Sequence, residues 1–352
     1  MVPRSPFLSL HIAPGAGVSD LPAAENLATR KPEPQGQARI SLSDYLAIAR
    51  PDHWIKNIFM LPGAALALIV DQQSGWASLP WLALGIVSTC LIASANYTIN
   101  EYLDGAFDRH HPTKSKRPTA QGRIKPHLVL IQYGVLIATG LGLASLLNPV
   151  FLYASVFLLV MGVLYNVKPV RTKDRAYVDV LSESINNPIR LVLGWAAIST
   201  IMLPPSSLLI SYWMGGAYLM AIKRFAEYRM IGDPERAARY RRSFGIYTDQ
   251  SLQLSAFFYA LTAVFFLGIF LIKYKIEFII SFPFFAFLFV WYQSIALRPN
   301  SAATNPEKLY LEPKLLAYVG FLAVLVLVLF LVDIPWLKYL TDHSVVLDKR
   351  IE

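Results

Sequence analysis

Residues 79–118 read LPWLALGIVSTCLIASANYTINEYLDGAFDRHHPTKSKRP, and this stretch joins three kinds of sequence in a fixed order. It begins with an apolar run at residues 79–101, which has the length of about 20 residues that a helix needs to cross a bilayer. It continues with acidic and amide residues spaced four apart and ends in a basic segment that contains proline. The order predicts a membrane helix whose end carries polar chemistry at the membrane surface.

The whole chain has the composition of an integral membrane protein. Its 352 residues are 55% hydrophobic and 16% charged, with a mean hydropathy of +0.44, whereas ordinary soluble domains carry about 25% charged residues. The net charge of +9 alone would allow nucleic-acid binding, but so apolar a chain argues against it. A single cysteine, Cys90, excludes an internal disulfide and any metal site built from several cysteines.

Apolar runs recur along the chain and predict an all-α polytopic membrane protein. We expect about nine transmembrane helices in one bundle around a cavity that faces the cytoplasm. The spans are expected at residues 54–71, 79–101, 127–147, 149–165, 180–201, 207–222, 251–272, 277–297 and 314–333. This places a transmembrane domain at residues 44–340, after a disordered cytoplasmic tail at 1–43 and before a short C-terminal tail at 341–352. The N-terminal tail has no apolar run of the kind found in signal peptides.

Basic residues are concentrated in alternate loops. The loops at 102–126, 166–179 and 223–250 hold 17 Lys and Arg residues, and the three loops that alternate with them, at 72–78, 148–149 and 202–206, hold none. Cytoplasmic loops of membrane proteins carry such an excess. We therefore expect the N-terminus and the basic loops on the cytoplasmic side of a bacterial inner membrane.

The end of the second span carries the first candidate site. Four residues at intervals of four share one helix face: Asn96, Asn100, Asp104 and Asp108. Stacked carboxylates repel one another without a cation, and their oxygens suit Mg²⁺, which takes phosphate oxygens as further ligands. Three bases that suit phosphate follow directly: Lys114, Lys116 and Arg117. The pattern predicts a Mg²⁺–diphosphate site, and the alternative is a solvated helix end with a basic loop.

The fifth span carries a second polar stripe. At 100° per residue, four of its residues fall on one narrow face: Asp179, Glu183, Asn186 and Arg190. Ionisable residues inside a span are costly and usually face the bundle interior or an aqueous cavity. Pro188 is expected to kink or open this helix. The stripe predicts a substrate-binding surface, and the alternative is a structural ion pair between Glu183 and Arg190.

Two further segments carry charge at the ends of spans. Lys223 and Glu227 lie one helical turn apart near the end of the sixth span, where they act in catalysis or form an exposed ion pair. Before the first span, the segment at residues 50–57 reads RPDHWIKN and combines basic residues with an interfacial Trp. We expect Lys56 and Asn57 to bind a headgroup, and the alternative is simple anchoring at the interface.

These motifs resemble those of the UbiA superfamily of intramembrane prenyltransferases over roughly residues 44–335. The superfamily's first aspartate-rich motif, N-D-x-x-D-x-x-x-D, stands here as Asn100-Glu101-Tyr-Leu-Asp104-Gly-Ala-Phe-Asp108. The resemblance implies that Asn100, Asp104 and Asp108 bind Mg²⁺ and the diphosphate of a donor. Glu101, which replaces the usual second-position Asp, is included among the expected metal ligands.

Within the superfamily, three segments are similar to the decaprenyl-phosphate phosphoribosyltransferase branch. They are Arg50-Pro51…Trp54-Ile-Lys56-Asn57, Asp108…His111-Pro112-Thr-Lys114…Arg117-Pro118 and Lys223-Arg224-Phe-Ala-Glu227. Superfamily prenyltransferases usually carry a second D-x-x-x-D motif where the third segment stands. Exchanging acids for bases there removes a second Mg²⁺ site and adds groups that suit an additional 5-phosphate. The stretch at residues 165–190 is more polar than this branch would lead us to expect.

The resemblance implies a Mg²⁺-dependent transferase that moves the 5-phosphoribosyl group of phosphoribosyl diphosphate to a polyprenyl phosphate and releases diphosphate. The candidate catalytic residues are Asn100, Asp104, Asp108, Lys223 and Glu227. The candidate substrate-binding residues are Lys56, Asn57, His111, Lys114, Arg117, Lys168, Arg171, Asp179, Glu183, Asn186, Arg190 and Arg224.

The expected partners are a polyprenyl lipid, a small donor that bears a diphosphate, and membrane lipid, with no nucleic acid. Two other functions stay open. One is prenyl transfer from a polyprenyl diphosphate to an aromatic or lipid acceptor, for which the same Mg²⁺ site would serve. The other is transport of an anionic substrate, although the chain shows no obvious internal repeat of the kind many transporters carry.

Overall fold

The computed structural model describes residues 41–71, 75–298, 301–304 and 312–340, and every regular element in these ranges is helical. The predicted tails lie outside the described residues, except for positions 41–43. The α-helices are α1 Leu42–Ala49, α2 Leu61–Val70, α3 Leu79–Asp108, α4 Pro126–Ser145, α5 Pro149–Asn166, α6 Val178–Ser184, α7 Asn186–Ala196, α8 Ser206–Ile231, α9 Pro234–Tyr240, α10 Asp249–Tyr274, α11 Phe282–Ala296 and α12 Pro313–Leu331. Short 3₁₀ segments join several of them, including η1 Pro51–Met60, η4 Thr172–Asp174 and η5 Arg242–Gly245.

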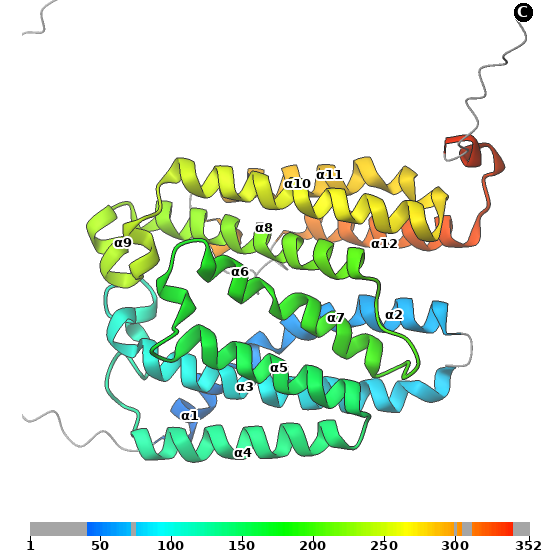
Figure 1. Ribbon diagram of the computed structural model, residues 1–352. Helices are drawn as coiled ribbons and strands as arrows, with labels where there is room; N and C mark the ends of the chain where they lie inside the picture. The colour runs from blue at the N-terminus through cyan, green and yellow to red at the C-terminus, as the bar shows by residue number, and fades with distance from the viewer. Residues whose placement is uncertain (1–40, 72–74, 299–300, 305–311, 341–352) are drawn as a thin grey trace, which may run out of the picture. The chain divides into compact units, whose positions relative to one another are not determined.

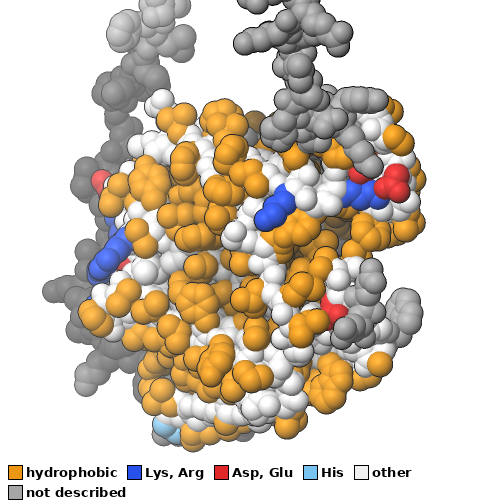
Figure 2. Space-filling view, turned by 45° about the vertical axis from the view of Figure 1, so that its right-hand side comes forward, with side chains coloured by type: hydrophobic (Ala, Val, Ile, Leu, Met, Phe, Trp, Pro, Cys, Tyr) orange, Lys and Arg blue, Asp and Glu red, His pale blue; other side chains and the backbone are white. Residues whose placement is uncertain are grey.

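Seven helical segments of the described chain are long and apolar enough to cross a membrane. They coincide with seven of the nine predicted spans, and the count of nine stays a prediction. The fifth predicted span is divided into α6 and α7, and the sixth lies in α8, whose 26 residues are less uniformly apolar. Hydrophobic side chains cover most of the face seen in Figure 2. This surface, together with the long apolar helices, is that of an integral membrane protein.

The long helices lie side by side, and the basic loops gather at one end of them (Figure 1). Helix α3 packs against α4 and α5, while α8 packs against α10. The loop after α3, the loop between α5 and α6, and α9 all lie at the left-hand end in Figure 1. The arrangement therefore brings together the segments that the charge pattern had placed on one side of the membrane.

The polar stripe of the fifth predicted span does not lie on one continuous helix. Helix α6 ends at Ser184 and α7 begins at Asn186, so the expected opening near Pro188 is confirmed. Proline has no N–H to donate to the carbonyl one turn earlier. The indole Nε1 of Trp213 on α8 donates to the Leu181 carbonyl at 2.9 Å beside this break.

Two glycines allow α7 to cross the first membrane segment closely. A Cβ atom on Gly194 would lie 1.9 Å from the carbonyl oxygen of Met60, and one on Gly63 would lie 2.0 Å from that of Leu191. Both neighbours are backbone atoms, which cannot move aside as the tip of a flexible side chain can. The crossing therefore requires glycine at both positions, and it fixes η1 and α2 against α7.

Candidate functional site

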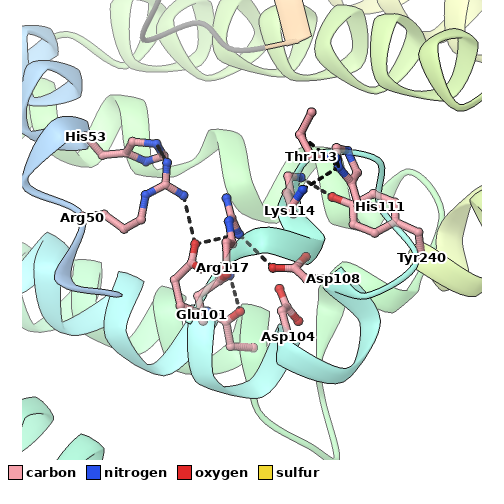
Figure 3. A network of polar contacts seen from close by, with 12 residues as sticks. Arg50, His53, Glu101, Asp104, Asp108, His111, Thr113, Lys114, Arg117 and Tyr240 are labelled. Carbon is pink, nitrogen blue, oxygen red and sulfur yellow. Dashed lines mark hydrogen bonds and ion pairs between the residues drawn. The ribbon is translucent and has the colours of Figure 1, made fainter. Parts of the chain in front are cut away.

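Charged side chains meet where the end of α3 approaches the loops that follow α3, α5 and α9. We call Glu101, Asp104 and Asp108 the α3 carboxylate cluster (Figure 3). Glu101 and Asp108 are buried, at 4% and 3% exposure. Three carboxylates on one helix end repel one another, and cationic side chains surround them.

Arg117, from the loop after α3, bridges two of these carboxylates. Its Nη1 lies 2.8 Å from Glu101 Oε1 and 2.9 Å from Asp108 Oδ2. Arg50, which precedes η1, places its own Nη1 2.9 Å from the same Glu101 oxygen. Glu101 is therefore held between two guanidinium groups, and Figure 3 shows both side chains pointing at it.

Asp104 is engaged by bases from the loop between α5 and α6. Lys173 Nζ lies 2.6 Å from Asp104 Oδ1, and Arg171 Nη2 lies 3.0 Å from it. Asn166 Oδ1 accepts a hydrogen bond from Lys173 Nζ at 2.7 Å and one from Asn100 Nδ2 at 2.6 Å. Burial lowers the pKa of Lys173 to about 8, against the opposing effect of the Asp104 carboxylate. Asn100 thus joins the network through its amide nitrogen.

A second group, the Glu227 cluster, forms around the end of α8. Glu227 Oε1 accepts from Lys114 Nζ at 2.7 Å and from the Tyr240 hydroxyl at 3.0 Å, while Oε2 accepts from Arg224 Nη1 at 3.2 Å. The Glu227 side chain is 3% exposed. Burial would lower the pKa of Lys114, but the Glu227 carboxylate outweighs burial and the pKa is raised. Lys114 therefore stays charged.

His111 is buried beside this cluster as a neutral ring. Its Nδ1 accepts from the backbone N–H groups of Thr113 and Lys114, each at 3.2 Å. These bonds place the ring proton on Nε2, which lies 3.4 Å from Glu227 Oε1. Burial lowers the pKa of His111. The ring accordingly orders the start of the basic loop and presents an N–H toward Glu227.

Asp179 anchors the far side of the Glu227 cluster. Its side chain is fully buried and accepts from the hydroxyls of Tyr247 at 2.7 Å and Ser243 at 3.2 Å, and from Arg224 Nε at 3.4 Å. Arg241 Nη1 lies 3.8 Å from the same carboxylate. Through these contacts Asp179 orients two arginines, Arg224 and Arg241.

The two clusters meet at a small cavity of about 20 Å³, which we call the polar cavity. It is lined by Asp104, Phe107, Asp108, Arg171, Lys173, Asp174, Tyr240, Arg241 and Arg242. With its lining ion pairs formed, this volume admits a single water or ion, and a larger anion would enter only if the Asp104 pairs with Arg171 and Lys173 opened. No group of three His, Cys, Asp or Glu side chains in the described ranges could hold a metal by itself. Mg²⁺ commonly uses one or two carboxylates together with substrate phosphates and waters, so Asp104 and Asp108 would suit it if a diphosphate supplied further oxygens.

Several predicted residues lie away from these clusters. Asn57 Oδ1 accepts from Arg190 Nε at 2.9 Å, and Asn57 Nδ2 contacts Cys90 Sγ at 3.1 Å. Cys90 precedes Asp104 on α3 by 14 residues, or roughly 21 Å at 1.5 Å per residue. Arg190 is thus well separated from the carboxylates, and no Glu183–Arg190 ion pair is found within the described chain.

Four other candidates are not among the residues that define the two clusters. Lys56 contacts His53 on η1 at 3.0 Å. Lys168 is exposed, and Lys223 is half-buried on α8. Asn186 is partly buried, and its Oδ1 atom has no hydrogen-bond partner among the described residues. Their predicted roles stay predictions.

Other residues of the site were not among the predicted site residues, although Arg50 stands in a segment that the sequence had singled out. They are Arg50, Asn166, Lys173, Tyr240 and Arg241. Asn166 and Lys173 lie inside the stretch that had stood out as unusually polar, which was the one available signal. In the sequence, Arg241 is one of several basic residues in a loop whose charge marks topology.

A larger cavity of about 540 Å³ lies between α5, α7 and α8, and we call it the apolar cavity. It is lined by apolar and aromatic side chains, including Phe157 on α5, Ile189 on α7 and Trp213 on α8. Ile185 and Pro188, at the break between α6 and α7, form part of its wall. Its lining suits a hydrocarbon chain.

The chain is similar in sequence to one protein family and to named bacterial enzymes. The sequence model of the UbiA prenyltransferase family matches residues 58–312. The chain is 31% identical over 205 residues to a decaprenyl-phosphate phosphoribosyltransferase of Mycobacterium tuberculosis, an alignment that covers 58% of this chain and 66% of the relative. It is 29% identical over 222 residues to the protein of that name from Mycolicibacterium smegmatis, covering 62% and 67%. The chain therefore spans about two thirds of the length of these relatives.

A solved structure shares the fold. It is a UbiA homolog from Archaeoglobus fulgidus bound to GPP and Mg²⁺, with a TM-score of 0.62 and 18% identity over 82% of this chain and all of that chain. At this identity the likeness concerns the arrangement of helices alone.

Proposed function

Because the chain belongs to the UbiA prenyltransferase family, we propose that it is a membrane-embedded transferase that moves the 5-phosphoribosyl group of phosphoribosyl diphosphate to a polyprenyl phosphate. Diphosphate is the leaving group and Mg²⁺ is the cofactor. The relatives named decaprenyl-phosphate phosphoribosyltransferase support this choice. The observation that supports this donor most directly is the Glu227 cluster. Two bases, Lys114 and Arg224, surround Glu227, the only carboxylate of the Lys223–Glu227 segment, where a second metal-binding motif would need more acids.

Asp104 and Asp108 would hold Mg²⁺ together with the donor's diphosphate, and the cation would neutralise the charge that develops on the leaving group. Asn100 donates through Nδ2, which leaves its Oδ1 oxygen for the same site. Glu101 is paired with Arg50 and Arg117. We therefore assign Glu101 to orienting Arg117 beside Asp108.

The basic residues of the polar cavity would bind the phosphate groups of the donor. Lys173 and Arg171 lie beside Asp104 and would bind the diphosphate by charge-assisted hydrogen bonds. As the bond between ribose C1 and the diphosphate oxygen breaks, C1 gains oxocarbenium character. A phosphate oxygen of the acceptor forms the new bond to C1. The acceptor phosphate is already anionic, so the reaction needs no strong base.

The apolar cavity would hold part of the polyprenyl chain, because its lining between α5, α7 and α8 is apolar. Residues of the basic loops line the polar cavity, and these loops gather at one end of the bundle (Figure 1). By the positive-inside rule this end faces the cytoplasm of a bacterial inner membrane. The water-soluble donor would then enter from the cytoplasm and the lipid from the bilayer.

A transfer assay tests this function. Purified protein in lipid vesicles receives polyprenyl phosphate, Mg²⁺ and phosphoribosyl diphosphate labelled in the ribose. The label is expected in the organic phase only when protein, Mg²⁺ and acceptor are all present, and it is lost in Asp104→Asn. Arg239→Gln is the matched control, because Arg239 is exposed on α9 and pairs with Glu235 at 3.7 Å. Absence of label transfer by folded protein that turns over a prenyl diphosphate would overturn the proposal.

Prenyl transfer is the second candidate. The family match and the α3 motif favour it, because an allylic diphosphate could use the same two carboxylates. The additional bases at Glu227 and around the polar cavity argue for a donor with a further phosphate. Family membership argues against the transporter alternative.

A further inference from the structure

The bases of the polar cavity come from two separate segments. Arg171 and Lys173 belong to the loop between α5 and α6, and both contact Asp104. Arg241 and Arg242 follow α9, and Arg241 adjoins the Glu227 cluster through Tyr240 and Asp179. Four bases and three acids line the cavity. The cavity is therefore lined by cations from two segments that are distant in sequence.

Arg241 has hydrogen-bond donors to spare. Its side chain is 14% exposed, and its Nη1 makes only a 3.4 Å bond to the Tyr165 hydroxyl and a 3.8 Å approach to Asp179. Its Nε is buried and has no hydrogen-bond partner among the residues described. An arginine carries five N–H donors in a rigid fork that matches phosphate. The contacts of Arg241 use few of them.

Neighbouring Arg224 is engaged much more fully. Its side chain is 4% exposed and donates to Asp179, Glu227 and the Tyr165 hydroxyl. Tyr165 and Asp179 contact both arginines. The protein therefore consumes the donors of Arg224 and uses the same two residues to position Arg241 at the cavity wall.

We propose that Arg241 binds the 5-phosphate of the donor, while Arg171 and Lys173 face its diphosphate. The inference rests on the proposed function and assigns the residue that distinguishes between the two candidate donors. A prenyl diphosphate carries phosphate at one end and needs one group of bases. Phosphoribosyl diphosphate carries phosphate at two positions of the ribose and uses both.

Equilibrium binding to the purified full-length protein with Mg²⁺ tests the assignment. The probes are phosphoribosyl diphosphate and inorganic diphosphate, and the variants are Arg241→Gln, Arg241→Lys, Lys173→Gln and the exposed control Arg239→Gln. Arg241→Gln is expected to weaken the binding of phosphoribosyl diphosphate about ten- to a hundredfold, because it removes a charge-assisted hydrogen bond. The affinity for inorganic diphosphate should stay unchanged. Arg241→Lys should reduce the affinity for phosphoribosyl diphosphate by a smaller factor. Lys173→Gln should reduce the affinity for both probes, and Arg239→Gln should change neither affinity.

Two outcomes would overturn the assignment: equal weakening of both probes by Arg241→Gln, or no weakening of phosphoribosyl diphosphate. Equal weakening counts only in a folded variant, which is established by a Tm equal to that of Arg239→Gln, because a misfolded variant would also lose both probes. Failure of the proposed function looks different. In that case the wild-type protein binds phosphoribosyl diphosphate no more tightly than inorganic diphosphate.

Discussion

Replacing Glu227 by Gln should destabilise the protein strongly. The Glu227 side chain is 3% exposed and receives Lys114 at 2.7 Å, Tyr240 at 3.0 Å and Arg224 at 3.2 Å. Removing one partner of a buried ion pair leaves the other charge uncompensated and costs about 3–5 kcal/mol. Here Lys114 loses its carboxylate partner while Arg224 keeps Asp179, so we expect a loss within that range.

The chain contains its own reporter for this measurement. Cys90 is the single cysteine and is 6% exposed, so a thiol-reactive fluorophore reports its exposure as detergent-solubilised protein is heated. Glu227→Gln should lower the Tm clearly. Glu235→Gln is the matched control, because Glu235 forms an exposed pair with Arg239, and such pairs contribute little to stability.

A double-mutant cycle separates the ion pair from general damage. Lys114→Met removes the cation that Glu227→Gln leaves unbalanced, so the double variant should lose less stability than the two single losses together. If Glu227→Gln unfolds at the temperature of Glu235→Gln, or if the stability losses of the two single variants simply add, the buried ion pair does not stabilise the protein.

Three other outcomes follow from the same structure. Mg²⁺ binding, measured by titration calorimetry, should tighten at least about tenfold with inorganic diphosphate because α3 offers few carboxylates of its own; equal affinity without diphosphate would contradict this. Gly194→Ala should lower the free energy of unfolding by about 1–3 kcal/mol or more, because the new methyl group overpacks against the Met60 carbonyl. Gly134→Ala is the control, because a methyl group there meets open space. Equal Tm values for the two variants would show that the backbone moves to accommodate the methyl group. Tyr247→Phe removes the 2.7 Å hydrogen bond to Asp179 and should lower the free energy of unfolding by about 1.5–3 kcal/mol. An unchanged Tm would show that this hydrogen bond does not stabilise the protein.

The sequence predicted the all-helical membrane fold and the polar end of α3 because both depend on local patterns. Apolar runs of span length identify membrane helices. The spacing of Asp104 and Asp108 by four places them on one helix face whatever the rest of the chain does. The opening near Pro188 was predictable for the same reason, because a missing N–H acts within one helical turn.

The partners of these residues could not be predicted, because they come from distant parts of the chain. Lys114 and Glu227 are 113 positions apart, and Asn57 and Arg190 are 133 apart. In the sequence Arg241 looks like the other bases of a topogenic loop, and only the folded chain shows it at the polar cavity. The residues of the local stripe have different partners, since Asp179 accepts from Tyr247 and Arg190 donates to Asn57, and the role of the stripe in substrate binding stays a prediction.

The choice of donor is tested most directly by competition. Vesicles containing the purified protein receive Mg²⁺, polyprenyl phosphate, and phosphoribosyl diphosphate and a polyprenyl diphosphate at equal concentrations. Mass spectrometry then identifies the lipid product while released diphosphate is measured. Our account predicts a polyprenyl phosphate heavier by one phosphoribosyl group, with one diphosphate released per product. Consumption of the prenyl diphosphate while phosphoribosyl diphosphate stays intact would contradict it.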